Sequence, residues 1–198
     1  MLGTFIQKQR EKFKYYDSIT GMSEILRRYF VMNAFDGALT ILGVLLGSFI
    51  ADIDNPVFVL KIGIATSIAV GISGLTGAMF AERAERKREI RAMEDALHRK
   101  LDNTEMKAAY DTASTLIALV DGISPLLASM FILLPFFFFS VADVHLAYQV
   151  SMCLALVVFF LLGMFLGRIS KESLFFTGIK LVMAGLVCML FIFLLEGL

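Results

Sequence analysis

The sequence predicts an all-α membrane protein with five transmembrane helices, the second and third extended into a cytoplasmic helical hairpin. The 198-residue chain is 58% hydrophobic and has a mean hydropathy of +0.78. A soluble domain of this size would leave too much of that apolar surface in water. Three long runs also lack Asp, Glu, Lys and Arg, and two shorter runs, 37–51 and 181–195, complete the set. The long runs are 62–81, 122–142 and 144–167.

These runs set the expected elements. A bilayer core of about 30 Å needs about 20 apolar residues of helix, and long, non-alternating runs favour helices over strands. We expect transmembrane helices over 31–51, 57–82, 112–140, 145–167 and 176–196. The chain then divides into an N-terminal segment, the first two helices, a cytoplasmic helical link and the last three helices. The corresponding residue ranges are 1–30, 31–82, 83–111 and 112–198.

The N-terminal segment reads as a cytoplasmic amphipathic helix. Residues 5–16 place Phe5, Phe13 and Tyr16 near one helical face among basic residues. This pattern is typical of a helix that lies on the anionic inner leaflet of a membrane. We expect no cleavable signal peptide, because this segment is polar and basic and lacks a short apolar core.

The second transmembrane helix is expected to continue beyond the membrane. Residues 78–100 contain neither Gly nor Pro and are rich in helix formers,. A helix over 58–100 would be ~64 Å long. Asp102, with Glu105 three residues later, resembles a capping box that starts the next helix. The second and third helices therefore form the predicted hairpin.

The positive charges are unevenly distributed, although the formal net charge is zero. Residues 8–28 hold six Lys and Arg and residues 83–107 hold eight, whereas the links 52–56 and 141–144 hold none. The positive-inside rule places the N-terminus in the cytoplasm and the C-terminus outside. We expect a multi-pass protein of the cell membrane, in contact with lipids, with no nucleic-acid partner and no cofactor.

Two carboxylates fall inside the predicted spans. Asp36 lies in the first span and Asp121 in the third, and an offset of 85 residues superposes Asp36-Gly37 on Asp121-Gly122. A carboxylate in a membrane costs about 2.5–3.5 kcal/mol and usually faces a partner, a cavity or an ion path. The matched positions suggest a shared site. The alternative is that Asn33, Ser124 or a backbone group caps each carboxylate.

Four possible metal ligands share one face of the extended second helix, because they are spaced by three or four residues. They are Glu82, Glu85, Glu89 and Met93. Oxygen ligands with a thioether suit a divalent transition metal. The alternative is a solvated face with ion pairs from Glu82 to Arg86 and from Glu85 to Arg88. Met79, one turn before Arg83, either lines a pore mouth or packs against apolar neighbours.

Small residues are spaced along several spans. Gly43 and Gly47, and Gly163 and Gly167, recur at four-residue intervals, and the second span has a similar series at Gly71, Gly74 and Gly77. Such positions allow close approach of helices in a bundle or at a dimer seam.

The first span also resembles a known family. The element Asp36-Gly37-x-x-Thr40-x-x-Gly43-x-x-x-Gly47 is similar to the first-helix signature of the vacuolar iron transporter family, and the likeness extends over most of residues 30–198. The resemblance implies a homodimer of five-helix subunits that moves Fe2+ or Mn2+ out of the cytosol in exchange for protons. It gives Asp36 a place on the metal pathway.

The second helix departs from that family's usual Gly-Glu-aromatic element, because this chain reads Gly77-Ala78-Met79. Glu82, one turn later on the same side, is the candidate substitute. The cytoplasmic link is also short for a metal-collecting domain.

The leading hypothesis is a metal/proton antiporter rather than an enzyme, with candidate metal ligands Asp36, Met79, Glu82, Glu85, Glu89 and Asp121. One alternative is an intramembrane aspartyl enzyme that uses Asp36 and Asp121. The other alternative is a membrane scaffold that transports nothing.

Overall fold

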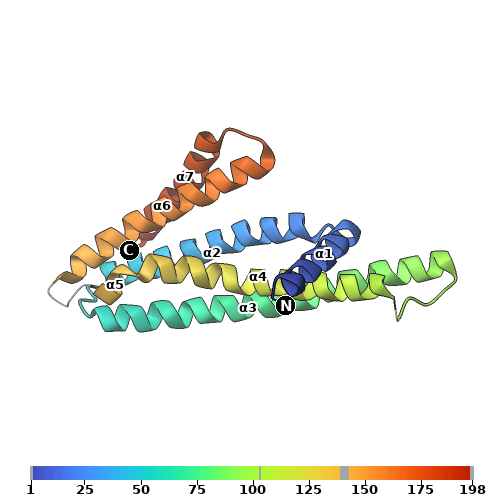
Figure 1. Cartoon of the computed structure of the whole chain (residues 1–198). Helices are drawn as coiled ribbons and strands as arrows, with labels where there is room; N and C mark the ends of the chain where they lie inside the picture. The colour runs from blue at the N-terminus through green and yellow to red at the C-terminus, as the bar shows by residue number, and fades with distance from the viewer. Residues whose placement is uncertain (1, 103, 139–142, 197–198) are drawn as a thin grey trace. The chain divides into compact units, whose positions relative to one another are not determined.

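The computed structural model describes residues 2–102, 104–138 and 143–196, and every regular element in these ranges is a helix (Figure 1). The elements are α1 (Leu2–Thr20), α2 (Met22–Ile50), α3 (Pro56–Leu97), α4 (Glu105–Leu133), α5 (Pro135–Phe138), α6 (Val144–Ser170) and α7 (Leu174–Glu196). The all-α class is therefore confirmed.

Five helices in the described ranges are long and apolar enough to cross a membrane. They are α2, α3, α4, α6 and the Leu174–Leu194 part of α7. Each contains most of one predicted span. The protein is thus a multi-pass membrane protein by the length and composition of its helices.

The boundaries differ from the prediction at two places. α2 begins at Met22, nine residues before the predicted start at 31, since Glu24 to Phe30 continue the helix without Gly or Pro. The third predicted span, 112–140, is wrong at its end, because α4 stops at Leu133 and Pro135 begins the separate short helix α5. Residues 139–142, which include the end of this span and half of the predicted link 141–144, lie outside the described residues.

The chain forms two compact units. The first unit comprises Met1–Phe30 and Ser73–Gly122, and the second comprises Val31–Ile72 and Ile123–Leu198. The first unit thus holds α1, the start of α2, the C-terminal half of α3 and the N-terminal half of α4. The second holds the remaining parts of α2, α3 and α4 with α5, α6 and α7.

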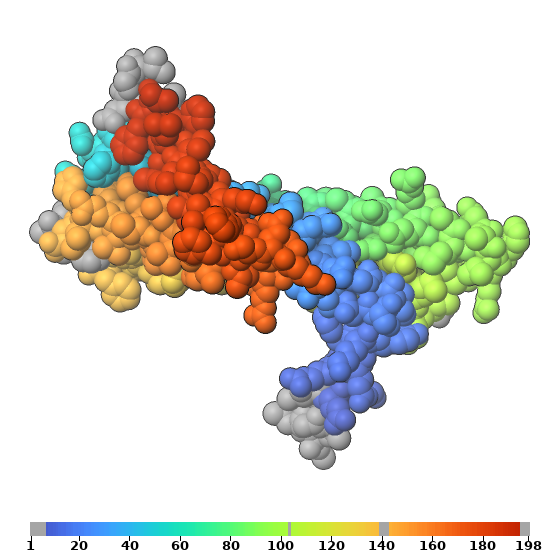
Figure 2. All heavy atoms as spheres, turned by 90° about the horizontal axis from the view of Figure 1, so that it is seen from above, coloured from blue at the N-terminus to red at the C-terminus, as the bar shows by residue number. Residues whose placement is uncertain are grey.

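The second unit has an aliphatic and aromatic core. Its fully buried side chains come from α2, α3, α4 and α6, among them Leu42, Leu46, Val59, Leu133 and Phe159. α6 and α7 lie side by side, in orange and red in Figures 1 and 2. A Cβ added at Gly163 would lie 2.6 Å from the Gly178 Cα, so the predicted close approach at Gly163 is confirmed.

The first unit has a smaller core, in which α1 packs against α4. Tyr16 and Met22 are buried against Ala109 and Ala113. α1 ends at Gly21, whose φ of +61° is the left-handed conformation that glycine adopts without strain. The Gly21 N–H donates to the Asp17 carbonyl at 2.8 Å, and α2 starts at the next residue.

The turn between α3 and α4 corrects the predicted capping box. Thr104, not Asp102, caps α4, because the Thr104 Oγ1 accepts a hydrogen bond from the Lys107 N–H at 3.3 Å. Asp102 instead accepts from the Lys107 Nζ at 2.7 Å. The spacing of Asp102 and Glu105 fitted the motif, but the helix begins two residues later than the motif requires.

Candidate functional site

Asp36 lies on α2 within the second unit, on a face that a single chain leaves exposed. Its carboxylate makes no hydrogen bond or ion pair with any residue in the described ranges. The sequence offered Asn33 as a possible capping partner, and the structure gives no such bond from Asp36. A charged side chain with this exposure inside an apolar span needs water, another protein surface or a bound cation beside it.

Gly37, the next residue, explains why α2 comes so close to α4. A Cβ at Gly37 would lie 2.4 Å from the Pro125 Cα and 2.5 Å from the Pro125 carbonyl oxygen. The Ser129 hydroxyl also donates to the Gly37 carbonyl at 3.0 Å. In the Asp36-Gly37 pair, an exposed carboxylate is therefore followed directly by a close contact between the backbones of α2 and α4.

Asp121 lies in the first unit and is buried, with 7% of its surface exposed. A Cβ at Gly74 would lie 2.9 Å from the Asp121 Oδ2 and 3.0 Å from its carbonyl oxygen. Gly74 thus allows α3 to approach α4 at this carboxylate. The sequence predicted a shared site for Asp36 and Asp121. In the structure, the two residues belong to different units.

Glu82 is the most buried of the predicted metal ligands on α3, with 5% of its surface exposed. Its Oε1 accepts a hydrogen bond from the Tyr29 hydroxyl of α2 at 3.0 Å. Its Oε2 lies 3.7 Å from the Arg86 Nε. A buried carboxylate needs this kind of compensation, because the low local dielectric penalises an unpaired charge.

Arg86 holds together a polar cluster, which we define as Tyr29, Glu82, Arg86, Glu89 and Tyr110. The Arg86 Nη1 donates to the Glu89 Oε2 at 2.9 Å. Its guanidinium carbon lies 5.4 Å from the centre of the Tyr110 ring, a cation–π distance. Its Nε is buried and makes no hydrogen bond within the described residues. One permanent cation therefore faces two carboxylates and one ring.

The remaining predicted ligands lie differently. Glu85 is exposed, and Met79 and Glu89 are half-buried. The expected pair from Glu82 to Arg86 is present, whereas no ion pair joins Glu85 to Arg88 within the described residues. Among those residues, no group of three or more His, Cys, Asp or Glu side chains is arranged to hold a metal ion. Arg86 takes the place between Glu82 and Glu89 that a cation would occupy.

Tyr29 and Tyr110 were not predicted, and Arg86 was expected only as an ion-pair partner in the alternative of a solvated face. Arg86 follows Glu82 at a spacing common on exposed helices, and nothing local marks the pair as buried. Tyr29 lies 53 residues before Glu82. Only the packing of three helices reveals the cluster.

The apolar helices define the class of the protein, a polytopic α-helical membrane protein. One unit contains a buried cluster of carboxylates and a guanidinium, and the other contains an exposed aspartate within an apolar span. The chain matches no family model. It is 34% identical over 172 residues to an uncharacterized protein of Methanocaldococcus jannaschii, across 85% of this chain and 87% of that protein. The chain belongs to the same family as that protein.

Proposed function

We propose that the protein transports a divalent transition metal, Fe2+ or Mn2+, out of the cytosol in exchange for protons. The observation that carries the proposal is Asp36, an exposed carboxylate in the apolar part of α2 that follows Arg28. The resemblance of its surroundings to the first helix of vacuolar iron transporters supports the same reading. A carboxylate in this position is expensive without water, a protein partner or an ion beside it, and a permeating cation or proton would fill this need.

The roles follow from the chemistry of each side chain. Asp36 and Asp121 are the proposed exchange groups, because a carboxylate can hold either a proton or a metal ion and metal binding must release the proton. Glu82, Glu85 and Glu89 are the proposed ligands that collect metal at the cytoplasmic end. Met79 adds a thioether that favours a transition metal over Mg2+ or Ca2+.

Arg86 gives the collecting site a built-in competitor. Its guanidinium sits 3.7 Å from a Glu82 oxygen and 2.9 Å from a Glu89 oxygen. A dication that binds both carboxylates must displace this guanidinium, because the three positive charges would repel at these distances. Metal collection is therefore proposed to involve a movement of the Arg86 side chain.

In the proposed topology, the N-terminus and the turn between α3 and α4 lie in the cytoplasm and the C-terminus lies outside. The support is that Lys and Arg are concentrated in the segments assigned to the cytoplasm. α3 is 42 residues long, about twice what a bilayer core requires. Its C-terminal half and the start of α4 are proposed to form a cytoplasmic hairpin. A homodimer is proposed to cover the exposed face of α2 that carries Asp36.

The test is transport in proteoliposomes loaded with a metal-sensitive dye. Wild-type protein should take up Fe2+ or Mn2+ when a proton gradient is imposed. Asp36→Asn keeps the size and polarity of the side chain but removes its charge and its proton, so uptake should fall at least tenfold. Glu85→Gln, on the exposed surface, should raise the half-saturating metal concentration and leave the coupling to protons unchanged.

The outcome also separates the alternatives. Wild-type rates and pH dependence in Asp36→Asn would make Asp36 a packing residue and end the proposed mechanism. Absence of uptake by the wild type for each of Fe2+, Mn2+, Co2+ and Zn2+ would favour the scaffold.

A further inference from the structure

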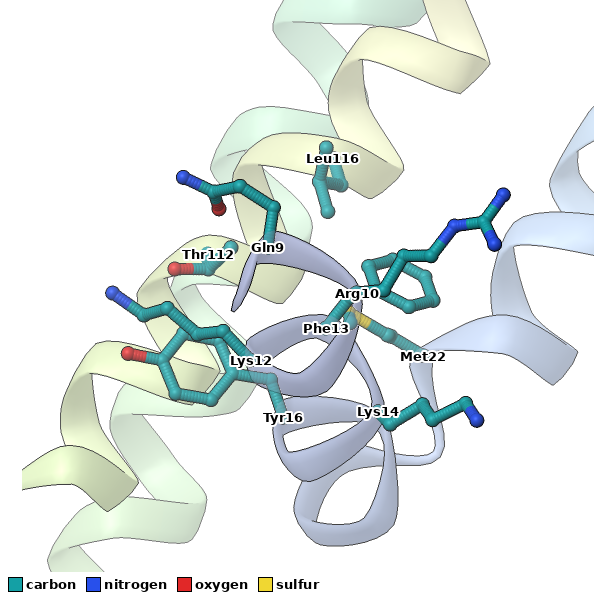
Figure 3. Close-up of a pocket in the computed structure, with 9 residues that line it drawn as sticks. All are labelled: Gln9, Arg10, Lys12, Phe13, Lys14, Tyr16, Met22, Thr112 and Leu116. Atoms are coloured by element: carbon teal, nitrogen blue, oxygen red, sulfur yellow. The ribbon is translucent and has the colours of Figure 1, made fainter. Parts of the chain in front are cut away.

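A cavity in the first unit lies between α1 and α4 and has a volume of about 860 Å³ (Figure 3). This volume is within the range of small-molecule sites, about 300–1,000 Å³. Its lining residues are Gln9, Arg10, Lys12, Phe13, Lys14, Tyr16, Met22, Thr112 and Leu116. The metal-transport proposal uses none of them.

The cations of this cavity are available to a ligand. Arg10 and Lys14 extend to one side of the cavity and Lys12 to the other (Figure 3). Within the described residues, none of the three forms an ion pair, and Lys12 only lies over the Tyr16 ring, 5.2 Å from its centre. The acidic side chains of α1, Glu11 and Asp17, do not line the cavity. The lining therefore carries three positive charges and no negative one.

Apolar side chains lie beside Gln9 and Thr112 in the remaining lining. Met22 is fully buried in the floor, and Leu116 packs beside it. Phe13 keeps 41% of its surface exposed, which is costly for an aromatic ring in water. A ligand that fits must combine a negative group for the cations with a hydrocarbon part for Phe13, Met22 and Leu116.

The cavity also lies where a membrane surface is expected. Met22 is the first residue of α2, a helix able to span a bilayer. Thr112 and Leu116 lie in the uncharged stretch of α4 between Asp111 and Asp121. α4 thus brings the cavity to the beginning of its uncharged sequence, whereas the apolar part of α2 follows Arg28. α1 projects from the rest of its unit in Figure 2.

We propose that this cavity binds one anionic phospholipid of the surrounding leaflet. Arg10 and Lys14, on one side of the cavity, hold the phosphate headgroup by charge-assisted hydrogen bonds, and Lys12, on the other side, attracts the negative charge at longer range. An acyl chain lies along Phe13, Met22 and Leu116. Tyr16 of α1 packs on α4, and its hydroxyl donates a hydrogen bond to the Glu105 Oε2 at 3.0 Å. α1 thereby forms one wall of a discrete site.

The test measures the affinity of the purified full chain in detergent for dioctanoyl-phosphatidylglycerol by microscale thermophoresis. The neutral analogue dioctanoyl-phosphatidylcholine should bind at least tenfold more weakly. Replacing Arg10, Lys12 and Lys14 together by Gln should weaken phosphatidylglycerol binding up to ~100-fold, because each cation near an anionic surface contributes about a factor of five. Phe13→Ala should weaken both lipids by a similar, smaller factor.

The matched control replaces three exposed cations of the same unit, Arg88, Arg99 and Lys100, by Gln. It removes the same charge and should leave the affinity within twofold of wild type. Equal losses in the two triple variants would overturn the proposal, since a general charge effect would then explain binding. Inorganic phosphate that competes as well as the lipid at equal concentration would also overturn it, in favour of a free anion.

A second measurement needs no variant. A photoactivatable phosphatidylglycerol should crosslink to the wild-type chain within peptides that contain residues 9–22 and 112–116. Labelling confined to other helices would overturn the proposal. A loss of dimer in the Arg10, Lys12 and Lys14 variant, without lipid labelling of the cavity in the wild type, would assign the cavity to a second copy of the chain instead.

Discussion

Arg86 carries a permanent charge into the interior of the first unit, where 8% of its surface is exposed. Glu82 and Glu89 compensate this charge on the same helix, and the Tyr110 ring covers the guanidinium from α4. Each of the three interactions alone is modest on a surface. In a buried position they become interdependent, because the loss of one partner leaves a charge without compensation.

Arg86→Gln is expected to destabilise the protein by about 3–5 kcal/mol. Among the described residues, the Glu82 carboxylate would then keep the Tyr29 hydroxyl as its one remaining donor. Thermal or denaturant unfolding in detergent would measure the change. Arg88→Gln, which removes the same charge from an exposed position on the same helix, should stay within about 0.5 kcal/mol of wild type.

Adding Glu82→Gln to Arg86→Gln should restore part of the loss, because the uncompensated negative charge is removed as well. A cost for Arg86→Gln no larger than that of Arg88→Gln would place Arg86 on a solvated face after all.

Gly37→Ala should also be strongly destabilising. The new methyl group would lie 2.4 Å from the Pro125 Cα, and relief of this overlap requires backbone movement that costs about 1–3 kcal/mol or more. Gly47→Ala is the matched control on the same helix, since a Cβ there meets nothing within 4 Å. The control should be neutral or stabilising by up to about 1 kcal/mol, the difference in helix propensity. Equal melting temperatures for both variants would contradict the close contact.

At the scale of elements, the sequence predicted the spans better than their ends. A run without charges indicates that a helix is able to cross the membrane, whereas the end of the helix depends on single residues such as Pro135, which starts α5. The start of α4 depends on whether Thr104 or Asp102 reaches a free N–H group. These choices involve about 1 kcal/mol each and are made by local geometry.

The candidate site was predictable only in part, for a similar reason. Asp36 and Asp121 are conspicuous because carboxylates are rare in apolar runs. The surroundings of Glu82 are not conspicuous, because its partner Tyr29 belongs to another helix. Hydropathy reports how a segment meets lipid and carries no information on which helices pack together.

The turn between α3 and α4 should show a defined pH dependence. The hydrogen bond and charge of Lys107 hold the pKa of Asp102 below its ordinary value. A lowered folded-state pKa means that the pair contributes stability above the unfolded pKa of about 3.9, and that this contribution is lost as the pH falls through the folded value.

Asp102→Asn should therefore lower the melting temperature slightly at pH 7 and make no difference at the acidic end of the titration. Since both side chains are exposed, the difference should shrink in 1 M NaCl. A difference between wild type and variant that grows as the pH falls would have the wrong sign for this pair.

At the scale of the whole molecule, the uneven distribution of Lys and Arg predicts its orientation in the membrane. In a background with Cys153 and Cys188 replaced by Ser, a cysteine at Asn55 should react with an impermeant maleimide added outside intact cells. A cysteine at Arg88 should react only after the cells are opened. Labelling of position 55 from the cytoplasmic side alone would reverse the proposed topology.

The contact of Gly37 with Pro125 also has a consequence for how this family diverges. Most contacts between helices tolerate substitution because a neighbouring side chain can change its size in return. Here the neighbour is backbone, which has no size to change, so a second substitution cannot rescue the first. With 34% identity to its Methanocaldococcus relative, the chain has drifted far at most positions. Glycine at position 37 is therefore expected to be kept throughout the family.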